Sequence, residues 1–104
     1  MYKNINQDEF RAGMASPDAV IIDVRTTGET FDGIIPNALH IDIMGGAFMD
    51  EVKKLDPSKA YYVYCRSGNR SGAACSAMAQ AGFSRVYNLI GGMMEWNGEL
   101  SMPR

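Results

Sequence analysis

The sequence has 104 residues, of which 46% are hydrophobic and 21% charged, and its net charge at pH 7 is −2. This length fits one compact domain, residues 1–104, and is too short for two domains with separate cores. The composition excludes wholesale disorder, and the slightly acidic balance argues against nucleic acid or an anionic membrane as the main partner.

Short apolar runs alternate with helical patterns along the chain. The runs predict strands at Tyr2–Ile5, Ala19–Val24, around Leu39, at Tyr61–Tyr64 and at Arg85–Leu89. Helical segments lie between them: one begins after Asn6 with the capping-box spacing to Glu9, and another covers Ser71–Ala81 and ends at Gly82. This alternation is typical of an α/β domain with a mainly parallel sheet and helices on both faces.

The cysteines and the first residues bear on the compartment. Two cysteines are too few for a disulfide scaffold, and they form no metal-ligand spacing. The first ten residues contain no apolar stretch of signal-peptide type, and nothing in the chain has the length of a membrane span. We therefore expect reduced thiols, a cytoplasmic location and a site without a metal.

The most informative stretch is the segment "CRSGNRS", which follows a strand and precedes a helix. Ligands of parallel sheets bind at this position, beyond the carboxyl end of a strand. Backbone N–H groups of such a loop and the following helix N-terminus favour an anion, which here can be the Cys65 thiolate itself. Arg66 and Arg70 add positive charge, and Gly68 permits a positive φ. The sequence thus predicts a catalytic Cys65 and a substrate-binding loop made of Arg66, Ser67, Gly68, Asn69, Arg70 and Ser71.

Three segments together resemble one known family. They are "DVRTTGETFDGIIPNA" from Asp23 to Ala38, the loop "CRSGNRS", and "LIGGMMEW" from Leu89 to Trp96. In this order and spacing they resemble single-domain members of the rhodanese (thiosulfate sulfurtransferase) superfamily. The resemblance implies a rhodanese-like three-layer domain, in which helices flank a five-stranded, mainly parallel sheet.

The resemblance also implies the chemistry. A persulfide on Cys65 would carry a sulfane sulfur from thiosulfate or a similar sulfur-containing anion to a thiophilic acceptor. Candidate acceptors are cyanide, a small thiol or a thioredoxin-like protein. Such covalent catalysis in two displacement steps needs no cofactor and gives ping-pong kinetics.

Two other functions stay open. One is a cysteine phosphatase or arsenate reductase, because the fold of the resembled family is shared with phosphatases whose loop reads C-x5-R. Cys65 and Arg70 have the shorter C-x4-R spacing. The second alternative is an interaction module that carries sulfur without turning it over.

The chain also departs from the family pattern, because Ile34 replaces the usual histidine and Asn37 the usual glycine. Asparagine tolerates a positive φ, so we expect the turn to survive.

The remaining polar and sulfur-containing candidates are interpreted as structural. Asp23 and Arg25 are expected to form a structural charge pair, and His40 to be a packed or surface side chain rather than a base. Cys75 is expected to be a small packed thiol in the helix after the loop. Met93, Met94 and Trp96 are interpreted as helix-packing residues, with the double glycine before them close to the mouth of the site.

Overall fold

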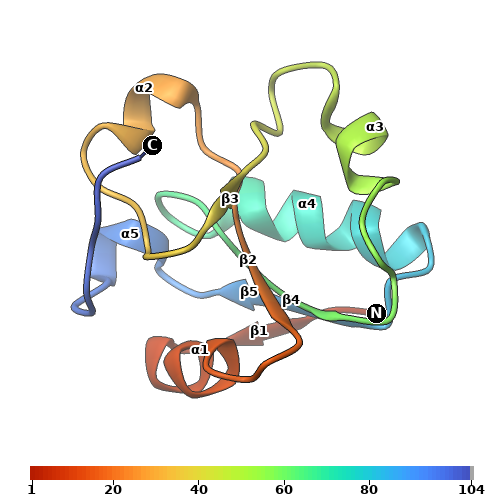
Figure 1. Ribbon diagram of the computed structural model, residues 1–104, viewed down its shortest axis with the longest axis horizontal. Coiled ribbons are helices and arrows are strands. Elements are labelled where there is room, and N and C mark those ends of the chain that lie inside the picture. Colours follow the sequence, from red (N-terminus) through yellow and green to blue (C-terminus); the bar gives the residue numbers. More distant parts are fainter. Residues whose placement is uncertain (104) are drawn as a thin grey trace.

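The computed structural model describes residues 1–103 and contains one five-stranded sheet in the order β1-β5-β4-β2-β3 (Figure 1). All its strand pairs are parallel. The strands are β1 (Lys3–Ile5), β2 (Ala19–Asp23), β3 (Leu39–His40), β4 (Ala60–Tyr64) and β5 (Arg85–Leu89). The predicted α/β class and the five parallel strands are confirmed. Where the prediction gave the bounds of a strand, its observed ends differ from them by at most one residue.

Within residues 1–103, four helices connect successive strands, and a fifth follows β5. They are α1 (Gln7–Met14), α2 (Thr27–Thr30), α3 (Phe48–Val52), α4 (Asn69–Gln80) and, after β5, α5 (Gly92–Glu95). The capping box predicted at Asn6 is present, since its side chain accepts from the Glu9 N–H and Glu9 bonds back to it. The helix after the "CRSGNRS" loop begins at Asn69, two residues earlier than the predicted Ser71. A left-handed Gly68 at the N-cap starts this helix early, so part of the loop belongs to its first turn.

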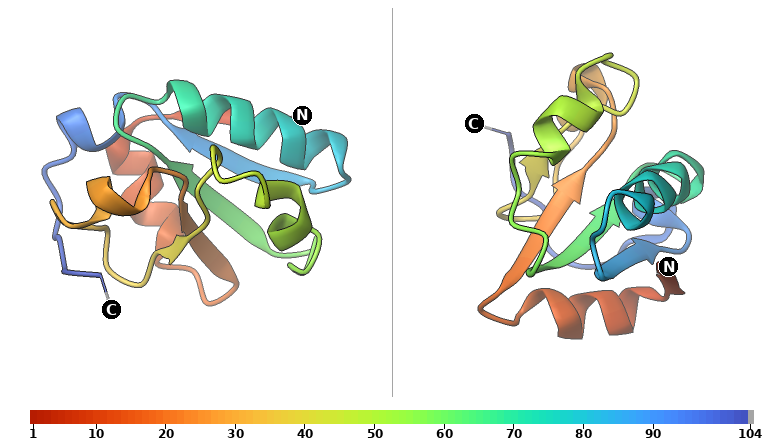
Figure 2. Two further views of the ribbon diagram at one scale, coloured as in Figure 1. Left: turned by 90° about the horizontal axis from the view of Figure 1, so that it is seen from above. Right: turned by 90° about the vertical axis from the view of Figure 1, so that its right-hand side faces the viewer.

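The sheet separates two layers of helices (Figure 2). The right-hand view places α1 on one side of the sheet and α3 and α4 on the other. The core on the α3 and α4 side contains Phe48, Val52, Cys75 and Met78, whereas the core on the α1 side is built around Phe10 and Tyr64. Because both faces of the central strand β4 are covered, all five of its residues are buried. Within residues 1–103 no helix combines the length and the apolarity needed to cross a membrane.

Candidate active site around Cys65

Cys65 lies directly after β4, where the central strand leaves the sheet and the chain turns into α4. Its side chain is fully buried, and its Sγ accepts hydrogen bonds from the Gly68 N–H at 3.1 Å and from the Ser71 hydroxyl at 3.3 Å. Donors from the loop and from the first turn of the helix therefore converge on the sulfur. Such an arrangement favours a sulfur anion.

The pKa of Cys65 results from two opposing effects. Burial alone would raise it, because a thiolate is poorly solvated inside a protein. Hydrogen bonds from the Ser71 hydroxyl and from the backbone N–H groups of Ser71, Gly68 and Ser67 outweigh burial and lower the pKa of Cys65 below its ordinary value. The site thus stabilises the nucleophilic form of the sulfur without a neighbouring general base.

Gly68 allows the loop to close around the sulfur. Its φ is +104°, and a Cβ there would lie 3.2 Å from the carbonyl oxygen of Leu89. A side chain would therefore meet both backbone strain and the end of β5. The other predicted loop residues differ in exposure: Arg66, Ser67 and Asn69 are exposed, Arg70 is half-buried and Ser71 is fully buried.

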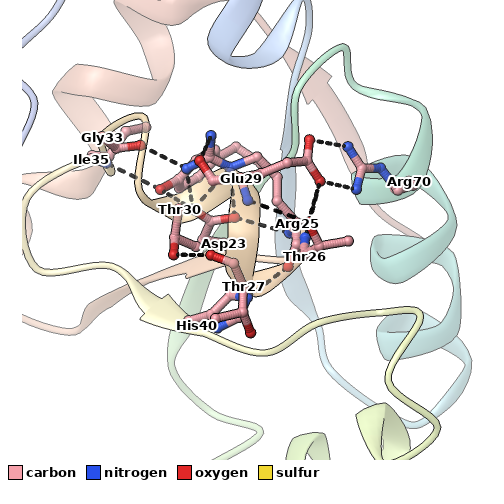
Figure 3. A network of polar contacts seen from close by, with 11 residues as sticks. Asp23, Arg25, Thr26, Thr27, Glu29, Thr30, Gly33, Ile35, His40 and Arg70 are labelled. Carbon is pink, nitrogen blue, oxygen red and sulfur yellow. Dashed lines mark hydrogen bonds and ion pairs between the residues drawn. The ribbon is translucent and has the colours of Figure 1, made fainter. Parts of the chain in front are cut away.

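The two loop arginines occupy different environments. Arg70 forms a bidentate pair with Glu29 of α2, with nitrogen to oxygen distances of 2.7 and 2.8 Å (Figure 3). The hydrogen bond from Arg70 lowers the pKa of Glu29 to about 2. Arg66 is exposed, and no carboxylate of residues 1–103 lies within ion-pair distance of it. The structure thus brings Glu29 into the loop region, which the sequence reasoning missed, and shows no ion-pair partner for Arg66 among residues 1–103.

A second polar network joins the end of β2 to the end of β4 and to the α2 segment. Asp23 and Arg25 form a buried ion pair at 2.7 Å, and Asp23 also accepts from the Tyr64 hydroxyl. Arg25 further donates to the carbonyl oxygens of Glu29 and Gly33 (Figure 3). The guanidinium of Arg25 thus bonds to a buried carboxylate and to two backbone carbonyl oxygens of the protein itself. The structural interpretation of Asp23 and Arg25 is confirmed.

Helix α5 touches the backbone of the loop. The N–H groups of Met93 and Met94 donate to the carbonyl oxygens of Cys65 and Arg66, at 3.0 and 2.9 Å. Gly92 makes this approach possible, because a Cβ there would lie 2.5 Å from both carbonyl oxygens. The predicted closeness of the double glycine to the site is therefore confirmed. Helix α5 is bonded directly to the backbone at the start of the loop.

A hollow of about 340 Å³ lies beside the loop. Its lining residues include Arg66, Glu29, Met93, Met94 and Leu100. A larger hollow of about 710 Å³ lies along β3 and is lined by Ile34, Asn37 and His40 among others. The segment containing Ile34 therefore lines a different hollow from Arg66. The turn predicted to survive at Asn37 does so with a φ of +71°.

His40 and Cys75 have the structural environments expected from the sequence. The Nε2 of His40 lies 2.6 Å from the Arg25 carbonyl oxygen, so this nitrogen carries the hydrogen and donates it. Cys75 is a free thiol packed in the core, and burial raises its pKa to about 12. The described residues contain no group of three or more acidic, histidine or cysteine side chains suited to a metal ion.

The site contains a further residue that the sequence reasoning missed. Asn88 is buried in β5, and its amide contacts both Ser71 and the carbonyl oxygen of Gly68. The available signal was the one amide in the otherwise strand-forming run "RVYNL". A buried polar side chain in a parallel strand needs partners, and here these partners belong to the Cys65 loop.

Comparisons with known proteins agree with this geometry. Residues 6–99 match the family model described as Rhodanese-like domain. The chain is 41% identical over 85 residues to a Bacillus subtilis protein named "Putative sulfurtransferase YtwF", covering 82% of this chain and 80% of that protein. It is 34% identical over 96 residues to the thiosulfate sulfurtransferase GlpE of Coxiella burnetii, covering 92% and 88%.

Solved structures give the same result. The crystal structure of a rhodanese-like domain protein from Staphylococcus aureus superposes with a TM-score of 0.84 at 32% identity, covering 98% of this chain and 99% of that one. A rhodanese-related protein from Thermoplasma volcanium gives a TM-score of 0.85 at 28% identity, covering 98% and 100%. The family match, the relatives and the shared fold together show that the chain belongs to the rhodanese-like domain family.

Proposed function

We propose that the protein is a sulfurtransferase that carries a sulfane sulfur as a persulfide on Cys65. The observation that carries the proposal is the convergence of the Gly68 N–H and the Ser71 hydroxyl on the Cys65 Sγ, with the pKa of Cys65 lowered as a result. This arrangement favours the thiolate, which is the nucleophilic form of the cysteine.

In the first step the Cys65 thiolate attacks the outer sulfur of thiosulfate. A bond forms between Sγ and that sulfur, while the bond to the sulfonate sulfur breaks and sulfite leaves with the electron pair. The negative charge then lies on the outer sulfur of the persulfide. The N–H groups of Ser67 and Gly68, which donate to Sγ, lie in the same loop, and we expect the loop N–H groups to stabilise this charge as well.

In the second step a thiophilic acceptor takes the outer sulfur. Cyanide attacks it, thiocyanate leaves, and the bond electrons return to Sγ as the thiolate. A small thiol or the exposed thiol of a thioredoxin-like protein would attack in the same way and become a persulfide itself. Both half-reactions balance without a cofactor.

We assign to Arg66 the role of attracting an anionic sulfur donor to the loop. It is exposed at the hollow beside the loop, with no carboxylate of residues 1–103 paired to it. The prediction that Arg70 also binds substrate stays a prediction. Since both terminal nitrogens of Arg70 bond to Glu29, an anion would have to share that guanidinium with a carboxylate.

The test is to incubate the protein with thiosulfate, remove excess donor and measure the intact mass. We expect a gain of one sulfur atom on Cys65 and its loss, as thiocyanate, when cyanide is added. A protein that gains no sulfur from thiosulfate or from a second donor such as an alkyl thiosulfonate would contradict the proposal. Stable loading without repeated turnover would instead favour a sulfur carrier.

A parallel assay addresses the phosphatase alternative. The C-x4-R loop closes directly on the sulfur, with the Gly68 nitrogen 3.1 Å from Sγ, so we expect negligible hydrolysis of an aryl phosphate. Phosphate release at a rate comparable to sulfur transfer would favour the phosphatase instead. The two assays together separate the three functions left open by the sequence.

A further inference from the structure

Two buried polar side chains, Ser71 and Asn88, connect Cys65 to β5. Ser71 is fully buried and Asn88 is 5% exposed. The Ser71 Oγ lies 3.3 Å from the Cys65 Sγ and 2.5 Å from the Asn88 Oδ1. One hydroxyl group therefore lies within hydrogen-bonding reach of two acceptors.

The orientation of the Asn88 amide follows from its other neighbours. Its Nδ2 lies 3.2 Å from the carbonyl oxygen of Gly68 and 2.9 Å from the Oδ1 of Asn4. A backbone carbonyl can only accept, so the NH2 group of Asn88 must face Gly68. The oxygen of Asn88 then faces Ser71, and it can be satisfied there only by the Ser71 hydroxyl hydrogen.

That single hydrogen cannot serve both acceptors well. When Cys65 is a neutral thiol, its S–H can donate to the Ser71 oxygen while Ser71 donates to Asn88, and every group has a partner. When Cys65 is a thiolate, the sulfur needs the hydrogen itself. If the Ser71 hydroxyl turns to the sulfur, the oxygen of Asn88 loses its donor in a buried position, which is unfavourable.

We propose that Asn88 is a positioning residue that competes with Cys65 for the hydroxyl hydrogen of Ser71 and so controls how readily the thiolate forms. The proposal rests on Cys65 being the proposed nucleophile. In the persulfide the charge lies on the outer sulfur, so Ser71 donates to Asn88. When the acceptor removes that sulfur, the Ser71 hydrogen turns to Sγ as the thiolate forms again.

Other groups face the sulfur and have to be kept constant in a test. Arg70, paired with Glu29, interacts electrostatically with Cys65 and also with Asp42. Cys75 on α4 interacts with Cys65 in the same way. Substitution of Asn88 leaves all of them in place, and a Cys75→Ala background removes the second thiol from the measurement.

The experiment measures the pH dependence of Cys65 alkylation by neutral iodoacetamide in the Cys75→Ala protein. Asn88→Leu frees the Ser71 hydrogen for the sulfur, so we expect the pKa of Cys65 to fall by about half a unit to one unit. Ser71→Ala should raise the pKa of Cys65. With Ser71→Ala already present, Asn88→Leu should cause no further shift. Asn4→Ala is the matched control, because it removes a partner of Asn88 without touching Ser71, and it should leave the pKa of Cys65 unchanged.

A purely structural role of Asn88 gives a different pattern. If Asn88 acts only by holding the Gly68 carbonyl, Asn88→Leu will shift the pKa of Cys65 equally with and without Ser71, and the proposal is overturned. The absence of any shift would overturn it as well. Alkylation does not depend on sulfur transfer, so failure of the proposed function and failure of this inference are distinguishable.

A second measurement avoids any substitution at Asn88, in case that variant does not fold. In 15N-labelled Cys75→Ala protein, the side-chain amide signals of Asn88 should follow the titration of Cys65. Adding Ser71→Ala should remove most of that movement, because the hydrogen that links the two groups is gone. Equal movement in both proteins would overturn the proposal.

Discussion

Arg70 and Glu29 are 41 residues apart in the chain and form two parallel hydrogen bonds, NH1 to Oε1 at 2.7 Å and NH2 to Oε2 at 2.8 Å. The pair joins the first turn of α4 to α2, and each side chain is about a quarter exposed. Glu29 also accepts from the Thr26 N–H within the α2 capping box. One carboxylate therefore ties the Cys65 loop, through Arg70, to the start of α2.

The first prediction concerns the pH dependence of this pair. Its hydrogen bonds lower the pKa of Glu29 from 4.5 to about 2 in the folded protein, so between these values the unfolded state binds more protons. The stabilising effect is complete above about pH 5 and is lost as the pH falls toward 2. We expect Glu29→Gln to lower the free energy of unfolding by about 1–2 kcal/mol at pH 7 and by less than about half as much at pH 3.

Urea denaturation of both proteins at the two pH values checks this prediction. Glu51→Gln is a matched control, because Glu51 pairs with Lys54 in a salt bridge whose side chains are at least half exposed. That substitution should change the free energy of unfolding by less than about 0.5 kcal/mol. A Glu29→Gln effect as small as the control would show that the pair does not stabilise the loop.

The second prediction separates the two thiols. Cys65→Ser should abolish the gain of sulfur from thiosulfate, because serine is not ionised at neutral pH and forms no persulfide. Cys75→Ala should retain most of the activity, because Cys75 is a packed thiol whose pKa is raised to about 12 by burial. Intact mass after thiosulfate treatment, with circular dichroism as a control for folding, measures both. Sulfur loading of the Cys65→Ser protein at the wild-type level would refute the assignment.

Much of the architecture could be predicted because it depends on local patterns. Apolar runs bounded by turn residues gave the five strands, since parallel strands covered on both faces carry few polar residues. The position of Cys65 followed from the rule that parallel sheets bind ligands at the carboxyl ends of their strands. The structural role of Asp23 and Arg25 followed from the cost of burying an unpaired charge.

The residues that escaped prediction depend on contacts between distant segments. Glu29 meets Arg70 only because α2 and the first turn of α4 lie together in the fold, and helical or strand periodicity carries no information about that pairing. Asn88 reaches Ser71 for the same reason, across the end of β5. The early start of α4 at Asn69 depends on the positive φ of Gly68, which the sequence permits without requiring it.

The third prediction concerns the support that α5 gives to the loop. Gly92→Ala would place a methyl group 2.5 Å from the carbonyl oxygens of Cys65 and Arg66, and the backbone there has a φ of +52°. Either the loop or α5 has to move, so we expect sulfur transfer to fall by at least about tenfold, with a loss of about 1–3 kcal/mol in the free energy of unfolding.

Gly28→Ala is the matched control for this substitution. Gly28 lies in α2, where a Cβ would meet no atom within 4 Å. Alanine should therefore leave activity unchanged and stabilise the short helix slightly. Thermal unfolding and the rate of thiocyanate formation measure both variants. Full activity of the Gly92→Ala protein would mean that the close approach of α5 is not needed to shape the site.

The fourth prediction tests which arginine attracts the donor. Arg66 is exposed beside the loop, whereas the guanidinium of Arg70 is engaged by Glu29. We expect Arg66→Ala to lower kcat/KM for thiosulfate by about three- to tenfold, mainly through KM, because a dianion loses a nearby positive charge. The effect should be smaller for methanethiosulfonate, which carries one negative charge, and should shrink as ionic strength rises. Arg66→Lys should restore most of the loss if charge alone matters.

These measurements also distinguish substrate attraction from loop stability. Arg70→Ala breaks the pair with Glu29 and should lower the free energy of unfolding, which Arg66→Ala should leave nearly unchanged because Arg66 forms no ion pair among the described residues. An Arg66→Ala protein that loses equal efficiency with both donors at every ionic strength would show that Arg66 acts through the shape of the loop. In that case the positive charge recognised by thiosulfate would have to come from another cation, such as Arg70 of the loop or Arg25, which lines the same hollow as Arg66.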